Sequence, residues 1–285
     1  MAARRLEVTM QGKKIALGGV ELNVQVTGEG PAILLLHGFP DSNALWRDVT
    51  PLLVAAGFQV IAPDQRGFGA SDAPKGARNY RIEYIVRDAI DLLDSLGIEK
   101  AHLVGHDWGA VIGWFLAGEH SDRFHSLTAI SVGHPRAYAN AGLEQKRKGL
   151  YTFFFQLRGL AEWYLSANRF ARFRKWVRDY PEADRWISDL SRPGRLSAAL
   201  GWYRANLRRM LTGSHPRCPL PTLGIWSSRD FALAEGQMTR SREFVDAEWR
   251  YERLEGFSHW IPLEAPRELS ALILAFIDEV GSRDL

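Results

Sequence analysis

Asp107 is the residue whose setting most clearly indicates chemistry. It is the centre of a Gly-His-Asp-Trp-Gly segment that joins a short apolar run to a predicted helix over Trp108–Glu119. A nucleophile with small residues two positions away on each side is typical of the sharp turn that exposes a catalytic side chain, here with Asp in place of the usual Ser. The helix start would direct backbone amides at negative charge formed there. A helix-capping role for Asp107 is the alternative interpretation.

An aspartate nucleophile predicts a different reaction from a serine nucleophile. A carboxyl group with an ordinary pKa of about 3.9 is already ionised at neutral pH. Its attack on an ester or amide would form a reactive anhydride, whereas attack on a saturated carbon that bears a leaving group forms a stable alkyl ester. Base-assisted hydrolysis can then release that ester. The residue type therefore favours an epoxide or an alkyl halide as the electrophile.

Two residues downstream of Asp107 complete an acid–base set. Asp230 follows a predicted strand over Thr222–Trp226, and His259 lies in the loop between the last predicted strand and the final helix. In proteins with this kind of turn, the nucleophile, the acid and the histidine follow one another in this order along the chain. Both residues would lie at the carboxyl ends of strands, where ligand clefts form in open α/β sheets. We expect Asp230 to orient His259, and His259 to deprotonate the hydrolytic water. Taken singly, Asp230 could be a turn residue and His259 a surface histidine.

The segment His37-Gly-Phe39-Pro40 follows the apolar run Ala32–Leu36. It stands where one oxyanion-binding amide is expected relative to such a turn. We assign the amides of Phe39 and Trp108 to the oxyanion hole that ester hydrolysis needs. Without Asp107 nearby in the fold, the segment would be interpreted as a simple turn.

Short apolar runs alternate with helix-period stretches, which predicts an α/β fold with a mostly parallel sheet flanked by helices. The predicted strands are Glu21–Val26, Ala32–Leu36, Gln59–Ala62, Ala101–Gly105, Leu127–Val132, Thr222–Trp226 and Arg250–Leu254; the predicted core helices are Ser42–Ala56, Ile82–Leu96, Trp108–Glu119 and Pro266–Val280. No strand-like run occurs between Pro135 and about Gly213. We therefore predict a core domain over 1–135 and 213–285, with an inserted helical cap over 136–212.

Composition limits the other function classes. The 285 residues carry a net charge of +3, but the predicted cap holds 16 Lys and Arg against 6 Asp and Glu, a net charge of +10. We interpret this excess as solvated helix faces, because no nucleic-acid-binding motif accompanies it. The one cysteine, Cys218, cannot form an internal disulfide. The basic start of the chain lacks the apolar region of a signal peptide, and no apolar run is long enough to span a membrane. We expect a cytoplasmic enzyme.

With these motifs in place, the chain resembles the epoxide hydrolases of the α/β-hydrolase fold over nearly its whole length. The similar segments are His37-Gly-Phe-Pro, Asp64-Gln-Arg-Gly-Phe-Gly-Ala-Ser-Asp, Gly105-His-Asp-Trp-Gly, Arg229-Asp-Phe and Gly256-Phe-Ser-His-Trp. The first three also occur, with variations, in dehalogenases of this fold. The resemblance implies a cis peptide bond between Phe39 and Pro40.

The resemblance also implies two cap tyrosines that donate hydrogen bonds to the epoxide oxygen. Trp-Tyr203-Arg is similar to a family signature and assigns Tyr203. The stretch that begins at Tyr151 resembles the surroundings of the other tyrosine more loosely, because Leu150 stands where Asp is usual. Phenols with a pKa of about 10 remain protonated at pH 7 and can stabilise an alkoxide leaving group. Other cap tyrosines, including Tyr138, are interpreted as core packing.

Five further residues are assigned to the substrate pocket: His37, Pro40, His106, His134 and Trp260. The remaining histidines have no metal-ligand spacing, and Cys218 is expected to be inert. The sequence predicts no metal and no organic cofactor. The expected partners are a small apolar epoxide and water.

Two rivals to an epoxide hydrolase remain at this stage. A haloalkane dehalogenase would use the same nucleophile, although Phe39 stands where many of those enzymes have Asn and Trp108 where fluoroacetate dehalogenases have Arg. A receptor of the same fold would bind ligand with little turnover, which the intact acid–base set disfavours. An ordinary esterase would need Ser in place of Asp107. The epoxide, the enantiopreference and the oligomeric state, a homodimer included, stay open.

Overall fold

The computed structural model describes residues 12–282, so the basic first five residues lie outside the described part. Eight strands form one sheet in the order β1-β2-β4-β3-β5-β6-β7-β8. The strands are β1 (Lys13–Leu17), β2 (Val20–Thr27), β3 (Ala32–Leu36), β4 (Gln59–Pro63), β5 (Ala101–His106), β6 (Phe124–Ile130), β7 (Thr222–Ser227) and β8 (Trp249–Leu254). β1, β2 and β4 pair antiparallel, and every other neighbouring pair is parallel. The predicted mostly parallel sheet is confirmed.

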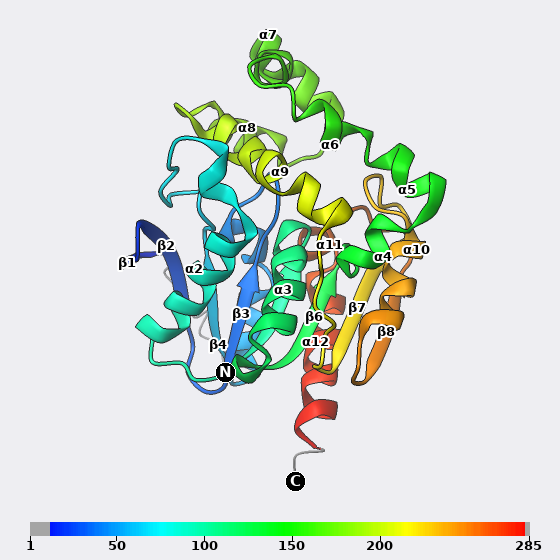
Figure 1. Ribbon diagram of the computed structural model, residues 1–285. Helices are drawn as coiled ribbons and strands as arrows, with labels where there is room; N and C mark the ends of the chain where they lie inside the picture. The colour runs from blue at the N-terminus through cyan, green and yellow to red at the C-terminus, as the bar shows by residue number, and fades with distance from the viewer. Residues whose placement is uncertain (1–11, 283–285) are drawn as a thin grey trace, which may run out of the picture.

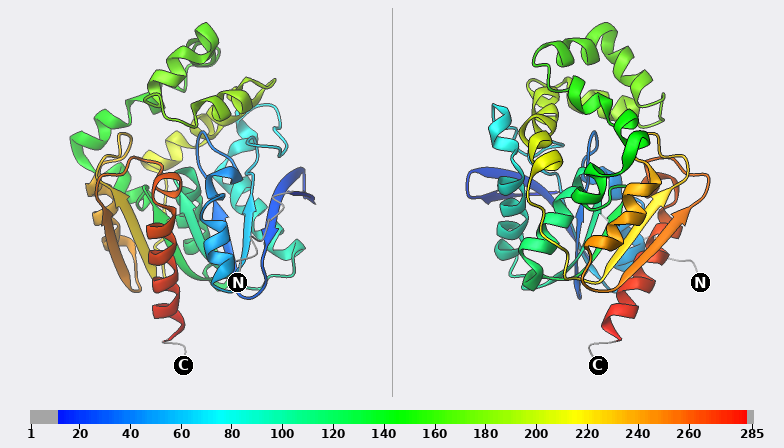
Figure 2. Two further views of the ribbon diagram at one scale, coloured as in Figure 1. Left: turned by 180° about the vertical axis from the view of Figure 1, so that it is seen from behind. Right: turned by 45° about the vertical axis from the view of Figure 1, so that its right-hand side comes forward.

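Helices cover both faces of the sheet (Figures 1 and 2), with α2 and α3 on one side and α1 and α12 on the other. The helices outside the 135–212 segment are η1 (Asn43–Trp46), α1 (Thr50–Ala55), η2 (Ala77–Tyr80), α2 (Ile82–Ser95), α3 (Trp108–Glu119), η3 (Ser121–Arg123), α10 (Glu235–Thr239), η4 (Arg240–Phe244), α11 (Ile261–Glu264) and α12 (Pro266–Gly281). The central strands β3 and β5 are buried along their whole length, as strands covered on both faces should be.

Six helices occupy the chain between β6 and β7. They are α4 (Pro135–Ala139), α5 (Gly142–Lys148), α6 (Leu150–Phe154), α7 (Leu160–Trp176), α8 (Ala183–Ser191) and α9 (Arg195–Thr212). Residues 167–170 interrupt α7 with non-helical backbone. Figures 1 and 2 show this helical segment across the end of the sheet at which the parallel strands finish. The segment therefore faces the turns that carry the predicted catalytic residues.

The structure departs from the predicted core elements in several places. The predicted helix Ser42–Ala56 is divided into η1 and α1, because Pro51 has no amide hydrogen and stands in the first turn of a new helix. β1 was not predicted, since it is an edge strand whose residues are mostly exposed and lack a clear apolar alternation. β6 begins three residues earlier than predicted and ends at Ile130, where Ser131 takes a positive φ of 68°.

No helix in residues 12–282 is long and apolar enough to cross a membrane. In the same range, no group of three or more Asp, Glu, His and Cys side chains is arranged to hold a metal ion.

Candidate active site

Asp107 occupies a strained turn between β5 and α3. Its φ of 53° and ψ of −119° lie outside the regions that L-residues favour. A Cβ on Gly109 would lie 1.9 Å from the carbonyl oxygen of Leu36, and one on Gly105 would lie 2.3 Å from that of Gly109. Only glycine at both positions lets the strands and the helix approach this closely. The side chain of Asp107 makes no capping bond to α3, so the capping interpretation has no support.

The Phe39 amide, just after β3, holds the Asp107 carboxylate. The Phe39 amide donates to its Oδ1 at 2.8 Å, and the Phe39–Pro40 peptide bond is cis, as the resemblance implied. Burial raises the pKa of Asp107, but His259, His106 and the Trp108 amide together outweigh burial and leave that pKa below its usual value. The carboxylate is therefore ionised at neutral pH. Both amides predicted for the oxyanion hole act on the same side chain.

His259 lies between the two carboxylates. Its Nδ1 is 2.8 Å from Asp230 Oδ2, and its Nε2 is 3.7 Å from Asp107 Oδ2, which is an ion-pair distance rather than a direct hydrogen bond. All three side chains are buried. Burial lowers the pKa of His259, but the Asp230 and Asp107 carboxylates raise it to about 10. The histidine therefore carries a proton at neutral pH while Asp107 is ionised.

The acid is fixed by its own loop. Asp230 Oδ1 accepts hydrogen bonds from the Ala232 and Leu233 amides at 2.8 and 2.9 Å, which leaves Oδ2 for His259. This acid loop, residues 230–234, is tied to α5 of the helical segment. Lys148 Nζ donates to the carbonyl oxygens of Asp230 and Leu233 at 2.8 and 2.9 Å. Gln145, which is buried, accepts from the Ala234 amide and donates to the Ala232 carbonyl.

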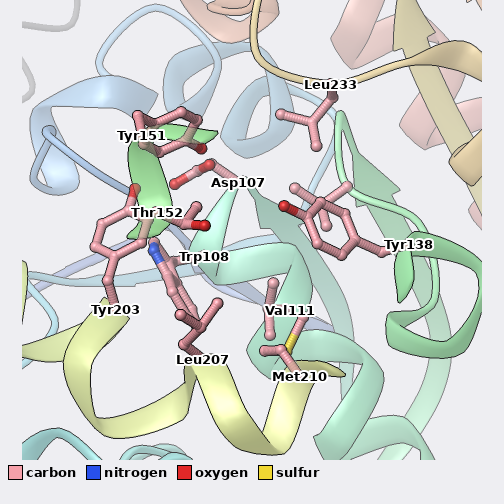
Figure 3. A pocket seen from close by; sticks show the side chains of 11 residues that line it. Asp107, Trp108, Val111, Tyr138, Tyr151, Thr152, Tyr203, Leu207, Met210 and Leu233 are labelled. Atoms are coloured by element: carbon pink, nitrogen blue, oxygen red, sulfur yellow. The ribbon is translucent and has the colours of Figure 1, made fainter. Parts of the chain in front are cut away.

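Tyr151 on α6 and Tyr203 on α9 lie on the same side of Asp107 (Figure 3). Their ring centroids are 6.0 Å apart, and the Tyr203 ring packs edge-on against Trp108 at 5.1 Å. Burial raises the pKa of both phenols well above 10, and the charge of Asp107 raises each pKa further. Both tyrosines therefore stay protonated and can only act as donors toward a developing oxyanion.

Asp107, Tyr151 and Tyr203 open onto one cavity, part of which is continuous with solvent. Its lining residues are Asp107, Trp108, Val111, Val132, Tyr138, Tyr151, Thr152, Tyr203, Leu207, Met210 and Leu233. Tyr138 on α4 was interpreted from sequence as core packing, but it projects into this cavity (Figure 3). One signal could have identified this position: Tyr138 lies eight residues beyond the end of β6, whose carboxyl end lies at the site.

None of the five residues assigned to the substrate pocket lines this cavity. His37 Nε2 accepts from the Gln65 amide at 2.9 Å, and His106 Nε2 donates to the His259 carbonyl oxygen at 2.9 Å. His134 caps α4 through its Nδ1, and Pro40 is buried beside Phe39. The Trp260 ring packs 4.3 Å from that of Tyr180.

Asp107 occupies the strand–helix turn at which α/β hydrolases carry their nucleophile, and His259 pairs with Asp230 beside it. This arrangement is that of an α/β hydrolase with a carboxylate as the nucleophile. A family model described as the alpha/beta hydrolase fold matches residues 31–266. The chain is 33% identical to the AB hydrolase superfamily protein YfhM of Bacillus subtilis, over 91% of this chain and 95% of that protein.

Several relatives indicate to which family of α/β hydrolases the chain belongs. Epoxide hydrolase A of Mycobacterium tuberculosis is 30% identical, with 91% of this chain and 94% of that protein covered. A crystal structure of Bacillus megaterium epoxide hydrolase in complex with an inhibitor superposes with a TM-score of 0.85 at 26% identity, and covers 93% of this chain and 100% of that one. The chain belongs to the epoxide hydrolase family of the α/β-hydrolase fold, and it is a hydrolase.

Proposed function

We propose that this protein hydrolyses epoxides to vicinal diols through an alkyl ester on Asp107, with Asp230 and His259 as the acid–base pair. The observation that carries the proposal is the residue at the turn: an ionised carboxylate faces two protonated phenols and lies 3.7 Å from the histidine. The names of the relatives support the same reaction class.

In the first step, an Asp107 oxygen forms a bond to an epoxide carbon and the carbon–oxygen bond of the ring breaks. The ring oxygen, which becomes a hydroxyl, takes a proton from the hydrogen-bonded phenols of Tyr151 and Tyr203. Water returns a proton to the phenol that donated it, and the His259 imidazolium releases a proton to water, so the phenols end protonated and the histidine ends neutral. Two aligned donors matter because an alkoxide is a poor leaving group.

Esterification of Asp107 then prepares the second step. The carboxylate charge that helped raise the pKa of His259 is gone, so this pKa falls and the neutral imidazole can act as a base. His259 takes a proton from water, and the hydroxide attacks the ester carbonyl carbon. The acyl carbon–oxygen bond breaks, and the expelled diol oxygen takes the proton of the new carboxyl group. Asp107 is again ionised and His259 again protonated.

The amides of Phe39 and Trp108 serve the second step as the oxyanion hole. The Phe39 amide already lies 2.8 Å from Oδ1 of Asp107, the oxygen that would become the tetrahedral oxyanion. No reorganisation is then needed when the charge develops, which is the condition for effective electrostatic stabilisation. The mechanism calls for no metal and no organic cofactor.

We further propose that residues 136–212 act as a cap on the core formed by 1–135 and 213–285. Tyr151 and Tyr203 come from this segment, whereas the nucleophile, acid and base come from the core. Four of the residues assigned to the pocket act in this proposal as supports: His106 holds the His259 backbone, Trp260 packs against the His259 ring, and His37 and Pro40 shape the turn after β3. His134 caps α4 instead.

The rival function is dehalogenation, because the same nucleophile could displace a halide and the Trp108 indole nitrogen lies beside the two phenols (Figure 3). The test is hydrolysis of styrene oxide beside a short bromoalkane. We expect diol from the epoxide and no bromide release. Bromide release without diol would establish the rival.

A second test addresses a receptor without turnover. His259→Gln should trap the ester, seen as a mass increase on the peptide that contains Asp107. A receptor without turnover would show no adduct.

A further inference from the structure

The cavity has two unlike sides. Figure 3 shows Tyr151, Tyr203 and the Trp108 indole nitrogen on one side of Asp107, and Tyr138 on the other. The wall near Tyr138 is apolar, with Val111, Met210 and Leu233. An epoxide whose oxygen binds the tyrosine pair must place its substituent toward this second side, since the first is occupied.

The Tyr138 phenol is the polar side-chain group of that second side. The hydroxyl of Thr152, which also lines the cavity, already donates to the Gly149 carbonyl oxygen at 2.7 Å. Burial raises the pKa of Tyr138 to about 12, the Gln145 amide lowers it and the charge of Asp107 raises it further. The phenol is therefore a protonated donor close enough to the nucleophile to sense its charge.

A donor in an apolar wall discriminates between substituents. When a substrate fills this side of the cavity and displaces water, the phenol either finds an acceptor on the substrate or is left unsatisfied. Sites built to hydrogen-bond one group reject analogues that lack it more strongly than apolar sites reject small changes of size. A hydrocarbon substituent and an oxygen-bearing one of equal length should thus bind differently.

We propose that Tyr138 is a specificity-determining residue that donates a hydrogen bond to an oxygen atom in the epoxide's substituent, which makes glycidyl ethers a favoured substrate class. The inference rests on the proposed epoxide hydrolysis and adds a binding contact to it. Tyr138 takes no part in ring opening, because the epoxide oxygen is held on the opposite side of Asp107.

The test compares phenyl glycidyl ether with phenethyl oxirane, in which a methylene group replaces the ether oxygen. The quantity measured is the ratio of kcat/KM for the ether to kcat/KM for the hydrocarbon. In Tyr138→Phe we expect this ratio to fall about tenfold, the equivalent of one hydrogen bond. The matched control is Tyr164→Phe, which removes a partly exposed cap phenol outside this cavity and should keep the wild-type ratio.

An unchanged ratio in Tyr138→Phe, or the same fall in Tyr164→Phe, would overturn the inference. A parallel calorimetric titration of each variant with the two corresponding diols separates this result from a failure of the proposed function. If the wild type hydrolyses neither epoxide, the proposed function fails, and the diol affinities still test the contact: a preference for the ether diol that Tyr138→Phe loses supports it, and equal affinities refute it.

Discussion

Removal of Lys148 should slow hydrolysis of the ester without slowing its formation. Lys148 Nζ donates to two carbonyl oxygens of the acid loop, at 2.8 and 2.9 Å, and the same loop orients Asp230 through two amides. Asp230 and His259 are needed as a base only in the second step. In Lys148→Met the loop loses these bonds, so the acid should orient His259 less well. The hydrogen bonds and the ion pair of Lys148 go to the acid loop and to Glu144, so the rate of the first step should not change.

The magnitude follows from the exposure of the lysine. A hydrogen bond to a charged group contributes about 1.5–3 kcal/mol when buried. The side chain of Lys148 is 24% exposed, so water replaces part of what is lost. A net loss of about 1–2 kcal/mol in the hydrolytic step corresponds to a rate roughly 5- to 30-fold lower.

The assay is a single-turnover reaction with excess enzyme, quenched at intervals and analysed by mass spectrometry. We expect the ester on Asp107 to accumulate in Lys148→Met and not in the wild type, with equal rates of ester formation. Lys148→Arg should recover part of the hydrolytic rate. Lys146→Met, an exposed change on the same helix, should behave as the wild type. Equal slowing of both steps, or no accumulation of ester, would refute the reasoning.

Three further predictions concern the phenols, the ionisation of the histidine and the turn. Tyr203→Phe should slow ester formation about 10- to 100-fold, because one donor to the alkoxide is lost, and stopped-flow fluorescence of the first step would detect this; an unchanged rate would remove Tyr203 from the site. The pKa of His259 is raised from 6.5 to about 10 in the folded chain, so its stabilising contribution is complete below pH 6.5 and is lost as the pH rises through 10. Urea unfolding should therefore show a falling free energy of unfolding over that range, and a slope equal to that of His259→Gln would contradict the assignment. Gly109→Ala should cost at least about 3 kcal/mol of stability, since its Cβ would lie 1.9 Å from the Leu36 oxygen; a melting temperature equal to the wild type would contradict the packing described.

The fold could be predicted from the sequence because its central strands are continuous apolar runs between clear helix signals. β5 and α3 meet at a motif whose glycines have a steric purpose, and this local signal fixed Trp108–Glu119 at the observed bounds. The edge strand β1 gave no such signal, because its residues are mostly exposed and pair only with β2.

The surroundings of the site were harder to predict for a physical reason. Sequence motifs identify residues in the turns that follow strands. Because the carboxyl ends of parallel strands meet at one edge of the sheet, Asp107, Asp230 and His259 could be predicted to lie close together. No such motif marks the cavity residues of the helical segment. The spacing of an aromatic residue along one of its helices is the same whether the side chain packs in the core or lines the cavity. Tyr138 was therefore interpreted as packing, although it enters the cavity. His37 and Trp260 were placed in the pocket but do not line it.

The fate of the oxygen atoms tests the central claim most directly. One turnover with excess enzyme in water enriched in oxygen-18, followed by mass spectrometry of the diol and of the peptide that contains Asp107, distinguishes the two routes. Covalent attack by Asp107 predicts an unlabelled first diol, whose new oxygen comes from the carboxylate, and heavy oxygen in the peptide. Heavy oxygen in the first diol, with none in Asp107, would contradict the mechanism.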